Sequence, residues 1–113
     1  MTQETDNKIK DLQMIEQNTQ QYVMQKQQFQ AQLVEIDSAM KELKQTDISY
    51  KIVGNIMVKT DIKDQLEDLK KKKEMFELRI KTLEKQESKL KEKAKEIQQE
   101  VLGDMKNDKQ WTA

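Results

Sequence analysis

The chain has 113 residues, of which 35% are hydrophobic and 37% are charged, so it is too polar to surround a thick globular core. Its 21 acidic residues balance its 21 basic residues, which argues against binding to nucleic acid or to an anionic membrane through net charge. Histidine and cysteine are absent, so the commonest general base and the thiolate metal ligand are missing. We therefore expect no enzyme, no metal site and no cofactor.

The chain begins without the basic stretch and apolar core of a secretion signal. No apolar run approaches the roughly 18 residues that span a bilayer. Proline is absent and glycine occurs twice, while strong helix formers such as Lys, Glu, Gln, Leu and Met dominate. We therefore expect a soluble cytoplasmic protein that consists mainly of long helices.

The first predicted helix covers about residues 5–45. Its apolar residues recur at alternating steps of three and four, the pattern of a coiled-coil seam, most clearly at Phe29, Leu33, Ile36, Met40 and Leu43. Toward the N-terminus the same series places Thr19 and Lys26 where leucine would be expected. The N-terminal part of this helix is therefore predicted to pack less tightly.

A β-hairpin is predicted at about residues 49–59, where apolar residues flank the pair Gly54-Asn55. A two-residue Gly-Asn connection suits the primed turns that match strand twist. A flexible linker is the alternative, but it has little use for five aliphatic or Met residues among the seven from Ile52 to Val58. Asp61, just after the hairpin, is a candidate N-cap for the next helix.

The second predicted helix covers about residues 61–105, followed by a flexible tail at 106–113. Its seam runs in strict three-four alternation through Leu66, Leu69, Lys73, Phe76, Ile80, Leu83, Glu87, Leu90, Ala94, Ile97 and Val101. Lys73 and Glu87 are the polar interruptions. Trp111 lies in the expected tail, and the sequence assigns it no role.

The two seams have nearly equal length on either side of the hairpin, so folding the chain there superimposes them. The predicted fold is all-α dominated: one domain, residues 1–113, formed by a long antiparallel two-helix coiled coil with a central β-hairpin. Each arm would extend roughly 50 Å or more at about 1.5 Å per residue. The two chain ends would then lie together at the free tip.

Pairing of Val53 with Ile56 would give the hairpin two apolar faces, of which a narrow helix pair can cover at most one. An isolated two-stranded hairpin is marginal in water, and its open edges invite strand addition. We therefore predict a ring or barrel of hairpins from several subunits. The predicted oligomerisation residues are Tyr50, Ile52, Val53, Gly54, Asn55, Ile56, Met57 and Val58.

The segment Tyr50-Lys51-Ile52-Val53-Gly54-Asn55-Ile56-Met57-Val58, between a Gln-rich first helix and a charged second helix, resembles the β-type subunits of archaeal or eukaryotic prefoldin. The resemblance covers nearly the whole chain. It implies a hexamer of two α-type and four β-type subunits, whose hairpins form an intersubunit double β-barrel. It further implies a chaperone that holds unfolded client proteins within six coiled coils and passes them to a cytosolic group II chaperonin.

Apolar residues near the expected free tip are candidates for holding a client. Some lie off the seam, and seam residues would join them if the tips splay; Met side chains suit a surface that binds many partners. The predicted client-binding residues are Ile9, Leu12, Met14, Ile15, Val23, Ile97, Val101, Leu102 and Met105. The alternative is that they are ordinary surface hydrophobes or tighten the helix pair. No Gly-rich phosphate loop suggests nucleotide use.

Two functions other than that of a chaperone can also be considered from the sequence. A structural coiled-coil rod or adaptor would dimerise along its length and bind a dedicated partner. The lysine run at residues 70–73 could suggest nucleic-acid binding, but successive helical residues point about 100° apart and acidic residues flank the run. We therefore expect no nucleic-acid partner.

Overall fold

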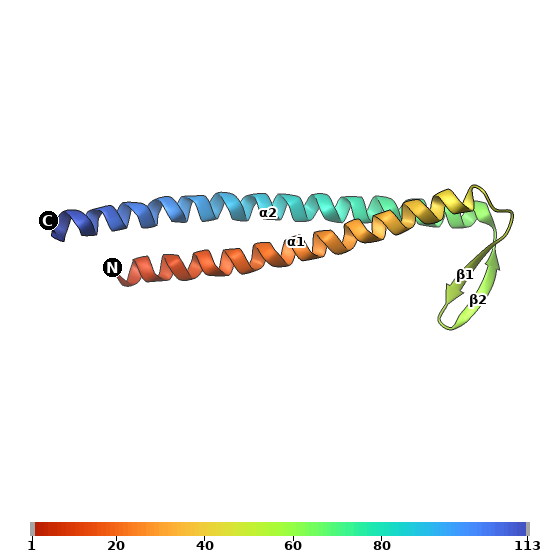
Figure 1. Cartoon of the computed structure of the whole chain (residues 1–113), viewed down its shortest axis with the longest axis horizontal. Coiled ribbons are helices and arrows are strands. Elements are labelled where there is room, and N and C mark those ends of the chain that lie inside the picture. The colour runs from red at the N-terminus through yellow and green to blue at the C-terminus, as the bar shows by residue number, and fades with distance from the viewer. Residues whose placement is uncertain (1, 113) are drawn as a thin grey trace. The chain divides into compact units, whose positions relative to one another are not determined.

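A computed structural model describes the backbone of residues 2–112 and the side chains of residues 2–107. Helix α1 (Gln3–Leu43), strand β1 (Ser49–Val53), strand β2 (Ile56–Thr60) and helix α2 (Ile62–Thr112) follow in that order (Figure 1). The predicted fold class, two long helices around an antiparallel hairpin, is confirmed. Across residues 2–112, no helix is both long and apolar enough to cross a bilayer.

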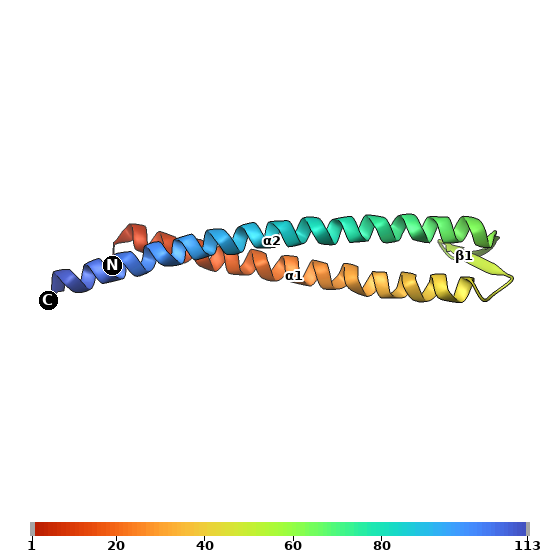
Figure 2. The same ribbon diagram turned by 90° about the horizontal axis from the view of Figure 1, so that it is seen from above.

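The chain divides into two compact units, which are described separately. Unit 1 combines residues up to 25 with residues from 82 onward, and unit 2 is the stretch Lys26–Lys81. Within unit 1, the N-terminal part of α1 lies beside the C-terminal part of α2 and runs in the opposite direction (Figures 1 and 2). Unit 2 contains the other parts of both helices and the complete hairpin.

Side-chain caps mark the start of both helices. The Lys63 amide donates to Asp61 Oδ1 at 3.2 Å, which confirms Asp61 as the N-cap of α2. The Thr5 amide donates to Thr2 Oγ1 at 3.3 Å, so Thr2 caps α1 in the same way. These bonds satisfy amides that have no partner within the helix, and they start α1 two residues earlier than the sequence predicts.

In unit 2, the seam is built around an aromatic pair. The rings of Phe29 on α1 and Phe76 on α2 have centroids 5.5 Å apart, and the Arg79 guanidinium lies 5.7 Å from the Phe29 centroid. Lys73 interrupts the apolar series, yet its Nζ reaches Asp37 Oδ1 at 2.8 Å. The hydrogen bond to Asp37 raises the pKa of Lys73. The lysine stem can therefore pack at the seam while its charge is neutralised at the edge.

In unit 1, the seam combines apolar layers with polar ones. Ile15 on α1 and Leu83 on α2 are buried, and so is the side chain of Glu87. Thr19 is half-buried, and its hydroxyl donates to the carbonyl of Ile15 at 2.8 Å, so it needs no partner from the other helix. The alternation of polar and apolar seam positions predicted from the sequence is therefore present.

Helix α2 continues to Thr112, whereas the sequence predicts an end near 105 and a tail at 106–113. Gly103 lies inside the helix, and an added Cβ there would meet no atom within 4 Å. One glycine costs only about 1 kcal/mol in a helix interior, and no proline follows to stop it. The side chain of Trp111 lies outside the described part of the chain.

Candidate functional site

The hairpin has the register expected from its sequence. Val53 pairs with Ile56, Ile52 with Met57, and Lys51 with Val58. Because directly opposed residues share a face, one face carries Val53, Ile56 and Val58, and the other carries Ile52, Met57 and Tyr50. Both faces are therefore apolar, as predicted.

The turn between the strands depends on Gly54, whose φ is +61°. No non-glycine residue in the described chain has a positive φ, so Asn55 has a negative one. A positive φ at the first turn residue alone is the signature of a type II′ turn, one of the two primed types expected. Glycine is therefore needed at position 54 for its backbone and not for space, since an added Cβ would touch nothing.

Alanine substitutions at the two glycines are expected to have opposite effects. Gly54→Ala forces an L-residue to a positive φ and should destabilise the protein by roughly 1–2 kcal/mol. Gly103→Ala relieves a helix-interior glycine and should stabilise it by up to about 1 kcal/mol. Urea unfolding followed by circular dichroism measures both. Equal shifts in the same direction would contradict the assigned turn.

The apolar side chains of the hairpin are exposed to solvent on both faces. Their exposed fractions run from 46% to 69% in the single chain, for Tyr50, Ile52, Val53, Ile56, Met57 and Val58. The hairpin is tied to α2 by polar contacts: Thr60 Oγ1 donates to Gln65 Oε1, and Gln65 Nε2 donates to the Tyr50 carbonyl at 3.4 Å. The hairpin is thus anchored at its base while its apolar surface is left uncovered.

A hollow of about 430 Å³ lies beside the hairpin within unit 2. Ile52 of β1 and Leu69 of α2 form its apolar walls, and Lys51, Asp68 and Lys72 are among its polar ones. The exposed face of Ile52 therefore continues into a recess next to the first turns of α2.

The predicted client-binding residues all lie in unit 1, where they differ in exposure. Met14, Leu102 and Met105 are exposed, as their positions off the seam predict. Ile9 and Val23, also placed off the seam by the sequence, are half-buried instead. The seam residues among them are half-buried or buried: Leu12, Ile15, Ile97 and Val101. While the two helices are paired, only three of the nine predicted client-binding residues are therefore exposed.

A polar cluster that the sequence analysis missed joins the helices near the chain ends. Thr5 is only 1% exposed, and its hydroxyl donates to Asp104 Oδ2 at 3.1 Å. Lys8 Nζ lies 3.1 Å from the same oxygen and 3.6 Å from Glu100 Oε2. The hydrogen bonds from Lys8 and Thr5 lower the pKa of Asp104, and the bond to Asp104 raises the pKa of Lys8. The cluster thus holds the two helices together in its ionised form.

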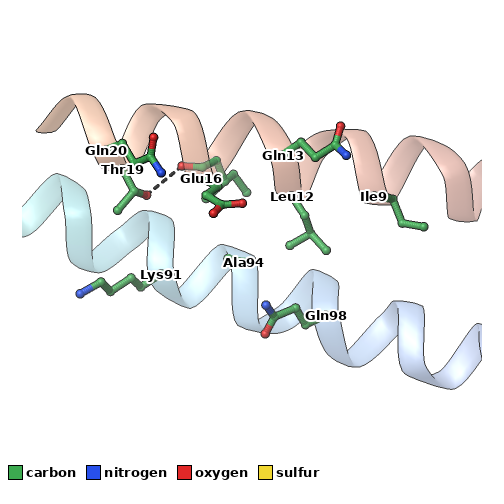
Figure 3. Close-up of a pocket in the computed structure, with 10 residues that line it drawn as sticks. Ile9, Leu12, Gln13, Glu16, Thr19, Gln20, Lys91, Ala94 and Gln98 are labelled. Carbon is green, nitrogen blue, oxygen red and sulfur yellow. Dashed lines mark hydrogen bonds between the residues drawn. The ribbon is translucent and has the colours of Figure 1, made fainter. Parts of the chain in front are cut away.

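A groove of about 570 Å³ lies between α1 and α2 of unit 1. In Figure 3, Leu12 and Thr19 point from α1 toward α2, where Ala94 lies opposite them. The small side chains at Thr19 and Ala94 leave space that larger seam residues would fill. The complete lining is Ile9, Leu12, Gln13, Ile15, Glu16, Thr19, Gln20, Lys91, Ala94 and Gln98.

Comparison with known proteins shows where this arrangement recurs. A family model described as "Prefoldin subunit" matches residues 6–107. The chain belongs to the prefoldin family. It is 41% identical over 98 residues to the prefoldin subunit beta of Archaeoglobus fulgidus, covering 84% of each chain. It is 42% identical over 89 residues to that of Thermococcus onnurineus, covering 76% of this chain and 77% of the relative.

A solved structure shows the same fold. The crystal structure of the prefoldin beta subunit from Thermococcus strain KS-1 has a TM-score of 0.84 and 33% sequence identity. The match covers 90% of this chain and 92% of that one. The resemblance to β-type prefoldin subunits is therefore confirmed by both sequence and structure.

Membership of the family has direct consequences for function. Prefoldin subunits are chaperones and not enzymes, so this chain is a prefoldin-type chaperone subunit. It assembles with other prefoldin subunits.

Proposed function

We propose that the chain is an ATP-independent holding subunit that captures non-native proteins with unit 1, prevents their aggregation and passes them to a cytosolic group II chaperonin. It works in the cytoplasm as part of a hetero-hexamer with α-type subunits and further β-type copies. The observation that carries the proposal is that each unit has exposed apolar side chains of its own, on the hairpin in unit 2 and at Met14, Leu102 and Met105 in unit 1.

The assembly part of the proposal is supported by the exposure of the hairpin. Ile52 and Ile56 lie on opposite faces, and each is 67% exposed. Full burial of an aliphatic side chain is worth about 1.5–3 kcal/mol, so several such residues on each subunit provide a large driving force. Neighbouring hairpins in an intersubunit β-barrel would cover both faces and pair the open strand edges.

The client part of the proposal is supported by adaptable apolar side chains in unit 1. Met14 and Met105 are exposed, and the unbranched thioether side chain fits irregular surfaces of many shapes. Each contact would be weak. Several copies acting on one unfolded chain would multiply the weak contacts into useful affinity through effective concentration. Release would then follow from handover and not from nucleotide hydrolysis.

The structural rod or adaptor is disfavoured by the pairing of the seams. A rod that dimerises along its length places each seam against another chain, whereas Phe29 here meets Phe76 of the same chain. The two seams of unit 2 thus pack against each other within one subunit, and the hairpin remains as an uncovered apolar surface of unit 2.

Aggregation assays test the proposed function. The full chain, assembled with an α-type prefoldin subunit, should suppress light scattering by a client diluted from guanidinium chloride. Suppression should be equal with and without ATP, because the sequence contains no Gly-rich phosphate loop. Addition of a group II chaperonin with ATP should then recover folded client. An assembly that leaves the scattering unchanged would refute the holding function.

A further inference from the structure

We propose that the polar cluster of Thr5, Lys8, Glu100 and Asp104 is a latch: while intact it keeps the ends of α1 and α2 paired, and when broken it lets them separate and expose the apolar seam beside it. The inference adds to the proposed function a device that sets how much client surface is available. Its effect on client binding rests on the proposed holding function, whereas its effect on helix pairing does not.

The polar cluster belongs to a continuous chain of hydrogen bonds that joins the two helices. Thr5 Oγ1 gives its one proton to Asp104 Oδ2, so the Thr2 hydroxyl, 3.0 Å away, donates to Thr5. The Thr2 oxygen in turn accepts the Thr5 amide at the start of α1. The N-cap of α1 is thus bonded through Thr5 to a carboxylate of α2. Unwinding of the first turn of α1 would therefore break the contact between the helices as well.

The members of the polar cluster depend on one another because two donors share one carboxylate oxygen. Lys8 Nζ lies 3.1 Å from Asp104 Oδ2, and its hydrogen bond, with that of Thr5, lowers the pKa of Asp104, so the carboxylate is ionised at neutral pH. Loss of the Asp104 charge would leave the almost fully buried Thr5 hydroxyl without its charged acceptor and Lys8 with only the more distant Glu100. The cluster should therefore break as a unit.

The seam beside the polar cluster packs poorly, so the cluster has a large share in holding the helices together there. The three-four series of α1 continues from Leu12 to Lys8 and Thr5, which are polar where a coiled coil ordinarily has aliphatic residues. Next to them lies the groove of about 570 Å³ between α1 and α2, where the small side chains of Thr19 and Ala94 leave space (Figure 3). Such a gap weakens apolar packing.

Separation of the helix ends would join buried and exposed apolar residues into one surface. Leu12 of α1 and Ile97 and Val101 of α2 are half-buried while the helices are paired, and Leu102 and Met105 are exposed nearby on α2. An intact cluster keeps this surface small, which limits self-association of the free protein. A client that binds the separated form better would shift the population toward it.

Spin labels test whether the polar cluster pairs the helices. The chain has no cysteine, so Asn7→Cys and Lys106→Cys place one label on an exposed position of each helix. Labelled subunits are diluted with unlabelled ones before assembly, so that labelled copies do not share an assembly, and double electron–electron resonance gives the distance within one chain. Lys8→Asp replaces attraction to Asp104 by repulsion. It should raise the ratio of separated to paired chains roughly tenfold or more, the loss expected from one charged hydrogen bond.

Three further variants show whether the effect belongs to this contact. Lys10→Asp makes the same change of charge at an exposed α1 position and should leave the distances unchanged. Asp104→Asn preserves the shape of the side chain and should increase the separated fraction by a smaller factor. Lys8→Asp combined with Asp104→Lys restores opposite charges and should recover most of the paired fraction.

Circular dichroism and sedimentation velocity establish that each variant is helical and assembled before its distances are compared. If neither Lys8→Asp nor Asp104→Asn increased the separated fraction, the latch would be wrong. Failure of the charge exchange to restore pairing would likewise overturn it, because the effect of Lys8→Asp would then not come from its contact with Asp104.

A binding assay tests whether helix pairing controls the client surface. The probe is fluorescently labelled, reduced and alkylated lactalbumin, whose binding to the assembled full-length protein is followed by anisotropy. Lys8→Asp should lower the dissociation constant several-fold, and the charge exchange with Asp104→Lys should return it to near the wild-type value. An unchanged dissociation constant in a variant whose helix ends have separated would overturn the control of client binding.

The two readouts separate this inference from the proposed function. If neither the wild-type assembly nor the Lys8→Asp variant bound lactalbumin, the holding function and the control of client binding would both be contradicted. The spin-label distances would still decide whether the polar cluster pairs the helices, because they are measured without a client.

Discussion

Replacing Ile52 and Ile56 with lysine is expected to dissolve the assembly. The two residues lie on opposite faces of the hairpin, so the variant places a charge on each apolar face. The lost burial amounts to roughly 3–6 kcal/mol per subunit, and desolvating the new ammonium groups costs more. Because about 1.4 kcal/mol corresponds to tenfold in affinity, subunit association should weaken by more than about a hundredfold. Sedimentation velocity at micromolar concentration measures the result.

A matched control distinguishes the hairpin from exposed hydrophobes in general. Val34 and Leu78 are 66% and 65% exposed, almost the same as Ile52 and Ile56, and they lie on the helices of unit 2. Val34→Lys with Leu78→Lys should leave the sedimentation coefficient of the assembly unchanged. If this control dissociated the assembly while the hairpin variant did not, the assigned interface would be wrong.

Removing residues 1–15 and 100–113 is expected to leave the assembly intact but to abolish most of the suppression of client aggregation. The truncation spares the hairpin and the aromatic pair of Phe29 and Phe76 in unit 2. It deletes the polar cluster and most of the groove floor in unit 1. Light scattering by a client diluted from denaturant, at equal subunit concentrations, measures the loss. Full suppression by the truncated protein would exclude unit 1 as the client surface.

A variant of full length separates the side chains from the length of the arms. Met14, Leu102 and Met105, all exposed in unit 1, can be replaced together by glutamine, which preserves helix propensity. Suppression should then weaken several-fold while the assembly persists. The corresponding change at Met75 and Leu78, exposed in unit 2, should have little effect. Equal losses in the two variants would mean that clients bind without preference for unit 1.

The hairpin and the seams follow from the sequence because each has a strict local period. Gly54-Asn55 between β-branched residues determines both the turn and the register, and the observed pairing of Val53 with Ile56 is the predicted one. The three-four spacing likewise places Ile36 and Leu83 in the buried seam. Asp61 was identifiable as a cap because its side chain acts on the adjacent helix start.

The polar cluster could not be predicted in the same way, because it depends on residues almost a whole chain apart. Thr5 is a small polar residue whose burial follows from its contact with Asp104, and nothing in its local sequence indicates that partner. A weak signal was present: Lys8 lies four residues before Leu12, at seam spacing.

The groove between the helices of unit 1 could not be predicted from the sequence for a related reason. Thr19 and Ala94 were recognised separately as members of their seams, but a cavity arises only where two small residues of opposite helices meet. Their meeting depends on the exact pairing of the helices, which equal seam length determines only to within a turn. The extension of α2 to Thr112 also departs from expectation, because one helix-interior glycine costs only about 1 kcal/mol and no proline follows to stop the helix.

Amide hydrogen exchange of residues 50–59 in the assembled protein tests the central claim most directly. Both faces of the hairpin are exposed in the single chain, and each strand has one edge without a partner strand in the two-stranded sheet, so protection of the outward-facing amides in the assembly must come from neighbouring subunits. We predict slow exchange throughout this segment in the wild-type assembly and fast exchange in the variant with lysine at both Ile52 and Ile56. Fast exchange in the intact wild-type assembly would contradict the account.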